Sequence, residues 1–316
     1  MLEPFDRDQF GGTPLYLDLV PYEIGRKTLY TAEDLYGVNN YDSSVYEYYL
    51  QKGKQARSPK ELMARSLHDY CIRKALEDFM DGRDLLRCIG VMGGHSLMRT
   101  DDQYHQIVRV CKRLTEEGFL MITGGGPGAM EATHLGAWMA GRTDADVEEA
   151  LRMLAVTPCF QNETWVATAM SVRERFPQKG DYESLGVPTW LYGHEPATPF
   201  ATHIAKFFDN SIREDFILTA AYGGIIFTPG SAGTLQEIFQ EAVQNHYLSF
   251  GFASPMIFLG KKFWGEDVPI YPLLQCLMDK GRYKNLILTL TDSEDEVVNT
   301  LVNFKPAFKN GASMEL

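Results

Sequence analysis

Short apolar runs alternate with longer amphipathic segments along most of the chain. Between the runs lie segments with helical periodicity, such as 100–117, where Thr100 and Gln103 have capping-box spacing and Gly118 marks the end. This alternation predicts an α/β fold, a parallel sheet with helices on both faces. Six runs have the length and composition of buried strands: 88–92, 119–123, 187–191, 224–228, 255–259 and 286–290.

The N-terminal part does not follow this alternation. It is irregular and tyrosine-rich up to about residue 57. A helix is predicted near 59–81, because Ser58 can cap it, Pro59 suits its first position and Glu61 completes a capping box, while Gly82 ends it. We therefore divide the chain into a mostly helical N-terminal extension (1–85) and a main domain (86–310) with a helical insertion near 141–185.

Composition and charge narrow the classes of function. The 316 residues are 45% hydrophobic and 23% charged, as in an ordinary folded protein. A net charge of −12 argues against non-specific electrostatic binding of nucleic acid, which needs clustered Lys and Arg. Apolar runs fall well short of the ~20 residues of a membrane helix, and the N-terminus lacks a signal-peptide pattern, so we expect a cytoplasmic protein without a membrane partner. Five scattered cysteines without C-x-x-C, and no metal-ligand spacing, predict neither a metal nor a cofactor.

Two glycine-rich loops each follow a predicted strand and precede a predicted helix. Glycines let the backbone approach a ligand closely, and the N-terminus of the following helix directs N–H groups at an anion. Ligands in parallel sheets bind beyond the carboxyl ends of the strands. Together the loops predict a site for a phosphate-bearing ligand, with these binding residues: Gly124, Gly125, Gly126, Gly128, Gly230, Ser231, Gly233 and Thr234.

Other readings of these loops stay open. Gly124, Gly126 and Ala129 fit G-x-G-x-x-A, the dinucleotide fingerprint of NAD(P)-dependent oxidoreductases, although that spacing alone is weak. Thr234 and Glu237 fit a T-x-x-E capping box, in which Glu237 would only cap its own helix. Each loop could also be a turn without a ligand. A P-loop NTPase is disfavoured because G-x-x-x-x-G-K-[ST] does not occur.

The two loops together resemble a known family. GGGPGAMEA (124–132) and PGSAGTLQE (229–237) are similar to the GGGxxGxM and PGGxGTxxE motifs of the LOG family, Rossmann-like nucleoside 5′-monophosphate phosphoribohydrolases often mislabelled lysine decarboxylases. Arg213 matches the arginine of the family's preceding helix. The resemblance runs from about Ile89 to Phe304, and the extension and insertion are closer to the longer bacterial purine/pyrimidine nucleotide nucleosidases. The chain departs from the family at Ser231, a family glycine, and at Ile212 and Glu214 around the arginine.

The resemblance implies a Rossmann-like fold, a homodimer or larger homo-oligomer, and hydrolysis of a nucleoside 5′-monophosphate to free base and ribose 5-phosphate. Breaking an N-glycosidic bond builds positive charge on the sugar, which a carboxylate can stabilise while it activates water. Glu237 is the candidate for this role, and Arg213 would hold Glu237 and the sugar or base in place. The alternative is a non-catalytic nucleotide-binding sensor or carrier on the same fold.

Five further residues are candidates for the site. His95 would line the cleft after the first strand, and Met130 belongs to the first motif. Asn210 and Glu214 lie within one turn of Arg213 and could orient it. Glu131 would either meet a ribose hydroxyl or sit at a helix start, where the helix dipole favours an acid.

Overall fold

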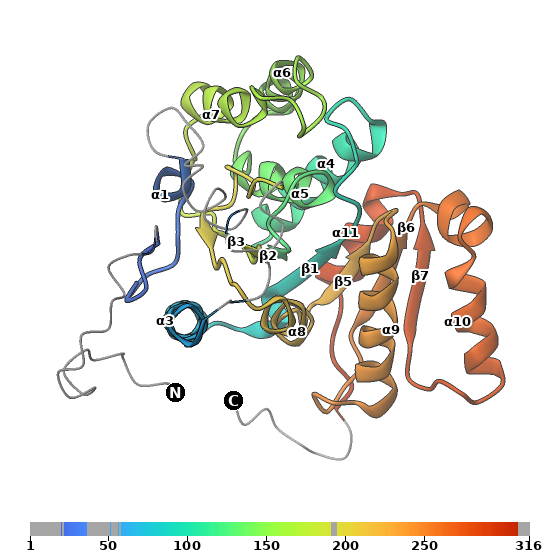
Figure 1. The fold of residues 1–316 in the computed structure, drawn as a ribbon. Helices are drawn as coiled ribbons and strands as arrows, with labels where there is room; N and C mark the ends of the chain where they lie inside the picture. Colours follow the sequence, from blue (N-terminus) through green and yellow to red (C-terminus); the bar gives the residue numbers. More distant parts are fainter. Residues whose placement is uncertain are drawn as a thin grey trace.

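The computed structural model describes residues 20, 22–36, 51, 56, 58–190 and 195–308. Within them lies a parallel sheet of seven strands in the order β4-β3-β2-β1-β5-β6-β7 (Figure 1). This confirms the predicted α/β, Rossmann-like fold. The strands are β1 (Cys88–Met92), β2 (Leu120–Thr123), β3 (Ser184–Gly186), β4 (His203–Ile204), β5 (Gly224–Phe227), β6 (Pro255–Leu259) and β7 (Ile287–Thr291).

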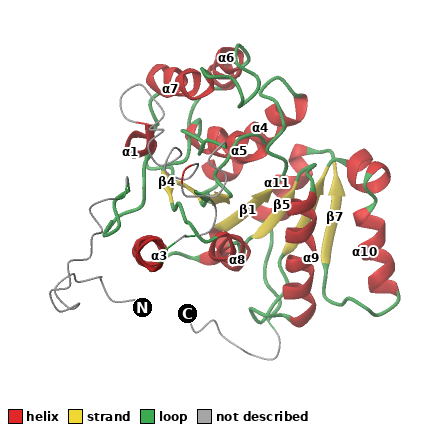
Figure 2. Cartoon of the chain, in the orientation of Figure 1, coloured by secondary structure: helices red, strands yellow, loops and turns green. Residues whose placement is uncertain are grey.

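Helices connect the strands and cover the sheet (Figure 2). In the N-terminal part they are α1 (Ala32–Tyr36), α3 (Pro59–Met80) and the 3₁₀ turn η3 (Leu85–Arg87). In the main part they are α4 (Asp102–Glu116), α5 (Ala129–Trp138), α6 (Asp144–Leu154), α7 (Trp165–Arg175), α8 (Asn210–Ala220), α9 (Ala232–Tyr247), the π-helical turn η4 (Phe263–Asp267), α10 (Ile270–Asp279) and α11 (Glu294–Val302). None of the helices in the described ranges is long and apolar enough to cross a membrane.

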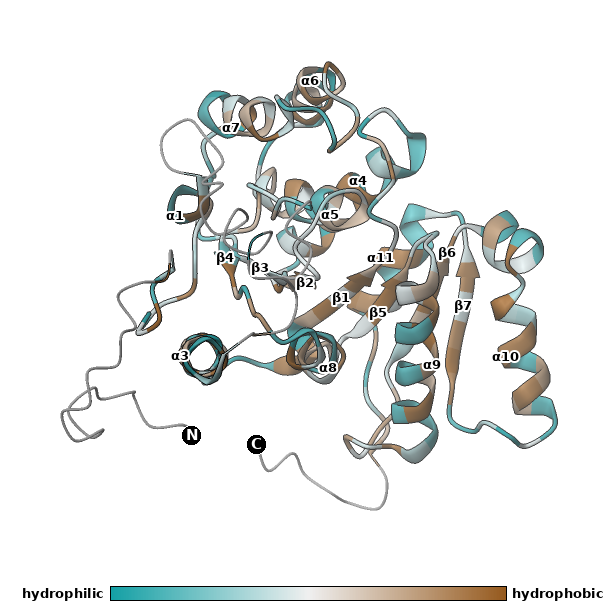
Figure 3. Cartoon of the chain, viewed as in Figure 1, coloured by the Kyte–Doolittle hydropathy of each residue, from teal (hydrophilic) through white to brown (hydrophobic). Residues whose placement is uncertain are grey.

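The central strands are buried on both faces, which explains their continuous apolar sequence (Figure 3). Side chains alternate between the faces with a period of two. In β1, Ile89 and Val91 belong to a core shared with α4, α5 and α11. Cys88 and Met92 belong to a second core, shared with α3, α8 and α9. The sheet therefore carries one layer of helices on each face.

The predicted strand at 187–191 is wrong, because β3 comprises Ser184–Gly186 and ends before it. Pro188 has no N–H to donate to a ladder, and a Cβ at Gly186 would lie 3.1 Å from the Cα of Gly125. The backbones of Gly186 and Gly125 approach each other closely, which only glycine permits. A search for apolar runs does not detect such a contact. The two-residue β4 was not predicted either. The other five strands match to within one residue at each end.

Of two predicted helix starts, one is confirmed and one is wrong. The helix expected near 59–81 begins at Pro59, and the Ser58 hydroxyl accepts a hydrogen bond from the Glu61 N–H at 3.2 Å. The capping box expected at Thr100 is wrong, because Asp101 is the N-cap of α4. The Asp101 carboxylate instead accepts from the Met98 N–H at 2.8 Å.

The irregular N-terminal segment is only partly covered by the structure. Its tyrosine-rich stretch around 41–49 lies outside the described residues. Helices α6 and α7 lie within the region 141–185. The division into an extension and a main domain stays a prediction.

Candidate functional site

A cavity of about 300 Å³ opens where the strand order reverses, beside the neighbouring strands β1 and β5. In open parallel sheets this switch point is where ligands bind. Segments from both glycine loops and from α8 and α9 meet here. The cavity is lined by Val91, Met92, Gly93, Gly94, His95, Gly124, Gly126, Met130, Pro188, Thr189, Glu195, Arg213, Glu214, Ser231, Gly233, Thr234 and Glu237.

The second glycine loop leads into a helix start that could bind an anion. Helix α9 begins at Ala232 with Ser231 as its N-cap, and the Ser231 side chain makes no capping hydrogen bond. A Cβ added at Gly233 would meet nothing within 4 Å, so the first turn of α9 borders open space. The N–H groups and the partial positive charge of this turn suit a phosphate. Because Thr234 is the third residue of α9, the capping-box reading of Thr234 and Glu237 is wrong.

The first glycine loop uses its N–H groups internally. The N–H of Gly125 donates to the Thr123 hydroxyl at 2.9 Å, and that of Gly126 points at the Met130 sulfur at 3.4 Å. The N–H of Ala129, at the start of α5, donates to the Gly94 carbonyl at 3.1 Å. The first N–H of α5 is thus already bound within the protein, which disfavours a dinucleotide pyrophosphate at this helix start.

The eight predicted loop residues therefore divide into two groups. Five of them line the cavity: Gly124, Gly126, Ser231, Gly233 and Thr234. The other three pack the backbone: Gly125 lies against Gly186 and Val187, Gly128 against Gly94 and His95, and Gly230 against Thr234. Gly125 and Gly128 have φ angles of +67° and +70°, which only glycine adopts easily.

The loop after β1 joins the two glycine loops, and the sequence reading missed it. The Gly94 N–H donates to the Pro229 carbonyl of the second loop at 3.0 Å, while the Gly94 carbonyl accepts from Ala129 of the first. The available signal was Gly93-Gly94 directly after a predicted strand, of which the sequence analysis used only the neighbouring His95.

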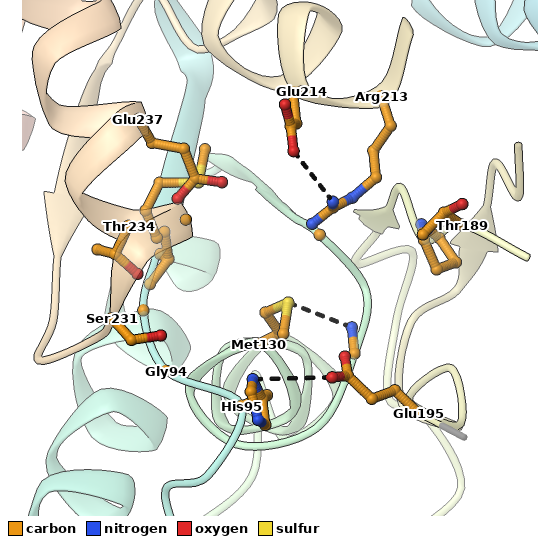
Figure 4. A pocket seen from close by; sticks show the side chains of 17 residues that line it. Gly94, His95, Met130, Thr189, Glu195, Arg213, Glu214, Ser231, Thr234 and Glu237 are labelled. Carbon is orange, nitrogen blue, oxygen red and sulfur yellow. Dashed lines mark hydrogen bonds and ion pairs between the residues drawn. The ribbon is translucent and has the colours of Figure 1, made fainter. Parts of the chain in front are cut away.

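Arg213 reaches the cavity from the first turns of α8 (Figure 4). Its Nε donates to the Val187 carbonyl and its Nη1 to the Asn210 side-chain oxygen, both at 2.9 Å. A Cβ at Gly124 would collide with Nη2, so the guanidinium packs on the first loop. The sequence predicted that Arg213 holds Glu237. Its hydrogen bonds in the structure go to Val187 and Asn210 instead.

Glu237 projects from the second turn of α9 into the same cavity (Figure 4). Burial raises the pKa of the Glu237 carboxyl to about 7, the charge of Arg213 opposes this shift, and Glu214 adds to it. A carboxyl with a pKa near neutrality can exchange a proton with a bound molecule at physiological pH. The site thus combines an open helix start, a cation and a titratable acid.

Asn210 and Glu214 organise α8 around Arg213. The Asn210 amide nitrogen donates to Glu214 at 2.5 Å, and Glu214 also accepts from Gln236 of α9 at 3.1 Å. Glu214 lies 4.0 Å from Arg213. Asn210 touches Arg213 without lining the cavity, whereas Glu214 does both.

His95 and Glu195 lie next to each other in the lining of the cavity. Their Nδ1 and Oε1 atoms lie 3.7 Å apart, and the His95 ring meets Phe160 edge-on. In Figure 4, Ser231 and Thr234 stand on one side, Thr189 and Glu195 on the other, and Met130 between them. Glu195 and Thr189 were not predicted, because they follow β3 in a stretch without a motif.

Glu131 does not line the cavity. It is fully buried and accepts hydrogen bonds from the Arg99 guanidinium at 2.5 and 2.9 Å and from the Tyr104 hydroxyl at 2.9 Å. Arg99 also donates to the Thr157 hydroxyl and packs over the Trp165 ring. Of the two readings of Glu131, the ribose contact is therefore wrong and the place at a helix start is confirmed, since Glu131 lies in the first turn of α5. Its buried ion pair ties α5 to the loop after β1 and to α7.

No group of three or more His, Cys, Asp and Glu side chains in the described ranges could hold a metal ion. All five cysteines are free thiols. Cys71, Cys88 and Cys111 are buried, and Cys159 and Cys276 are partly exposed.

Comparisons with known proteins give structural likeness only. No protein-family model matches the chain, and no curated protein matches it. Similar solved structures include a molybdenum cofactor binding protein from Rippkaea orientalis (TM-score 0.42, 15% identity, 68% of this chain and 97% of that one). A structural genomics target named TM1055 has a TM-score of 0.45 at 17% identity, over 69% of this chain and 99% of that one.

A third similar structure is the molybdenum cofactor carrier protein from Chlamydomonas reinhardtii. Its TM-score is 0.38 at 15% identity, and the match covers 68% of this chain and 98% of that one. At these values the likeness carries no argument about function, so the proposals below rest on the site.

Proposed function

We propose that the protein hydrolyses the N-glycosidic bond of a nucleoside 5′-monophosphate to free base and ribose 5-phosphate. The observation that carries this proposal is the meeting of the α9 helix start, Glu237 and Arg213 in one cavity at the switch point. The resemblance of the two loops and Arg213 to the LOG motifs supports the same reaction.

The cavity suggests how a nucleotide would lie. The 5′-phosphate would accept hydrogen bonds from the N–H groups of Gly233 and Thr234, where the helix dipole favours an anion. The sugar would then lie below Glu237 and Arg213, and the base would extend toward Thr189 and Glu195 (Figure 4). This assignment places the acid at the sugar rather than at the phosphate.

In the proposed reaction, water adds to the anomeric carbon as the bond to the base nitrogen breaks. The Glu237 carboxylate stabilises the positive charge on the sugar and accepts the proton that the water loses. The base leaves with the bonding electron pair and takes up a proton from solvent. Arg213, held at Val187 and Asn210, would fix the sugar or the base with its planar guanidinium.

A non-catalytic sensor or carrier is the second candidate. It is favoured by the pKa of about 7 at Glu237, because a large part of this carboxyl is then protonated at neutral pH and cannot stabilise a cation. Under this candidate the same helix start holds the phosphate group, and the ligand is released unchanged.

One screen separates the two candidates. Purified protein is incubated with a panel of purine and pyrimidine 5′-monophosphates, and free base is measured by chromatography. Release of base from at least one of them supports hydrolysis. Calorimetric binding with full recovery of the intact nucleotide supports the carrier. The binding panel also holds the molybdenum cofactor, the ligand named for two of the similar structures.

We also propose that the chain forms a homodimer or larger homo-oligomer. Val243 and Tyr247 expose apolar surface one turn apart on α9, with 42% and 72% of each residue accessible. Light scattering of the full chain tests this proposal, and a monomer at micromolar concentration would contradict it.

A further inference from the structure

Helix α3 of the N-terminal part anchors the start of α8 through one carboxylate. Asp69 is buried. Its two carboxylate oxygens accept hydrogen bonds from the backbone N–H groups of Phe208 and Asp209, at 2.8 and 2.7 Å. These are the last two residues before α8. Arg65, one turn earlier on α3, places its guanidinium over the Phe208 ring, 5.3 Å from the ring centre. The segment that begins α8 is therefore held by α3 rather than by the sheet alone.

Asp69 is itself held by a buried chain of hydrogen bonds. Its Oδ1 lies 3.1 Å from Nδ1 of His68, and Nε2 of His68 lies 2.9 Å from the Tyr30 hydroxyl. The Asp69 carboxylate can only accept a hydrogen bond, so Nδ1 of His68 donates to it, and Nε2 then accepts from the Tyr30 hydroxyl. Tyr30 also exchanges two backbone hydrogen bonds of 2.8 Å with Ile204 of β4.

The anchored segment leads directly to Arg213. Asn210 is the first residue of α8 and follows Asp209, which caps the helix by accepting from the Ser211 N–H at 2.9 Å. The Asn210 side chain then accepts from Nη1 of Arg213. A shift of the segment that Asp69 holds would move Asn210 and, with it, one of the two hydrogen bonds that orient the guanidinium.

We propose that Asp69 is a positioning residue for the site, acting through the start of α8 on Arg213, and that Tyr30 and His68 make the N-terminal part necessary for that role. The inference rests on the function proposed for Arg213. It assigns a task to a part of the chain that lies outside the LOG-like motifs.

The experiment compares two variants of the full chain. Asp69→Asn keeps the size of the side chain but replaces one acceptor oxygen by an NH₂ group that would face a backbone N–H. Arg83→Gln is the matched control, because it removes a 2.6 Å ion pair between Arg83, which follows α3, and Glu183, which precedes β3. We expect Asp69→Asn to lower kcat for base release roughly 10- to 100-fold with a smaller change in KM, and Arg83→Gln to change kcat less than about twofold.

A double-mutant cycle separates positioning from a general loss of structure. In an Arg213→Lys background, Asp69→Asn should lower kcat no further, because its effect passes through the guanidinium. Full additivity of the two substitutions would overturn the proposal. Tyr30→Phe removes only the distal hydroxyl and should lower kcat in the same direction by a smaller factor. An unchanged kcat in both Asp69→Asn and Tyr30→Phe would also overturn it.

Hydrogen exchange tests the same inference without catalysis. In Asp69→Asn, amides 208–214 should exchange faster than in wild type, while amides 232–240 of α9 keep their rates; Arg83→Gln should leave 208–214 unchanged. If wild type releases no base from any nucleotide, the hydrolysis proposal fails, and faster exchange at 208–214 still supports the anchoring by Asp69. Unchanged exchange at 208–214 would contradict the anchoring.

Discussion

The N–H of Gly94 donates a hydrogen bond to the carbonyl oxygen of Pro229 across neighbouring strands of the sheet, at 3.0 Å. Gly94 follows β1 and Pro229 follows β5, so this bond fixes the two walls of the switch point relative to each other. A Cβ at Gly94 would lie 3.1 Å from that same carbonyl oxygen, which is closer than about nine in ten real Cβ contacts. The shape of the cavity thus depends on a position with no side chain.

We predict that Gly94→Ala weakens binding of AMP about 10-fold, because the loops must separate to admit the methyl group. Isothermal titration calorimetry measures the change. Gly25→Ala is the control, since a Cβ there meets nothing within 4 Å, and it should bind AMP like wild type. An unchanged affinity in Gly94→Ala would show that the cavity tolerates a shift of the second loop.

Gly233→Ala is expected to separate stability from binding. The added methyl group has open space, and alanine favours a helix over glycine by about 0.5–1 kcal/mol, so the melting temperature should stay the same or rise. The methyl group would stand where the phosphate approaches the first turn of α9, so AMP affinity should fall. Thermal unfolding and calorimetry on the same sample check both parts. Undiminished affinity would place the phosphate elsewhere.

Glu131→Gln should destabilise the folded protein without changing its affinity for AMP. Replacing one member of the buried Arg99–Glu131 pair leaves an uncompensated buried charge, which typically costs about 3–5 kcal/mol. Urea unfolding measures this loss, and AMP affinity of the folded fraction at low temperature should stay near that of wild type. A large loss of affinity at full folding would return Glu131 to the binding site.

His134 should make the fold sensitive to acid. It lies between the Thr123 hydroxyl at 2.7 Å and the Ser184 hydroxyl at 2.9 Å. Burial lowers the pKa of His134 to about 3. Below pH 6.5 the unfolded chain takes up a proton on this histidine and the folded chain does not. The contribution of neutral His134 to the free energy of unfolding is therefore complete above pH 6.5 and is lost as the pH falls toward 3.

Urea unfolding of wild type and His134→Gln between pH 7.5 and pH 4 tests this effect. The glutamine does not titrate, so the advantage of wild type over the variant should shrink by up to about 1.4 kcal/mol per pH unit below 6.5. A constant difference across this range would mean that His134 is protonated equally in both states.

The sequence predicted what depends on local pattern. The strands 88–92 and 255–259 are continuous apolar runs, and their bounds were found to the residue. The second glycine loop was recognised from its short, regular spacing, and Arg213 was recognised from the resemblance to the LOG motifs, which also gave Glu237 its role. All of them line the cavity or adjoin it in the structure.

What the sequence could not predict depends on contacts between distant segments. Glu131 sits in a motif, yet Arg99, 32 residues earlier, decides that it is a buried ion-pair partner. Asp69 acts on amides about 140 residues later, and no periodicity links the two. Gly125 and Gly128 looked like ligand contacts, but their neighbours in space are Gly186 and His95.

Base release by Glu237→Gln decides whether Glu237 is the acid that the proposed reaction needs. Glu241→Gln is the matched control, since Glu241 lies one turn further on α9, is buried, has a pKa raised by burial to about 7, and hydrogen-bonds Ser254 away from the cavity. We predict that Glu237→Gln lowers kcat about 100-fold or more while AMP still binds, and that Glu241→Gln keeps its activity. We also predict that wild-type kcat rises with pH through about 7, as Glu237 loses its proton. Base release by Glu237→Gln at the wild-type rate would contradict the account.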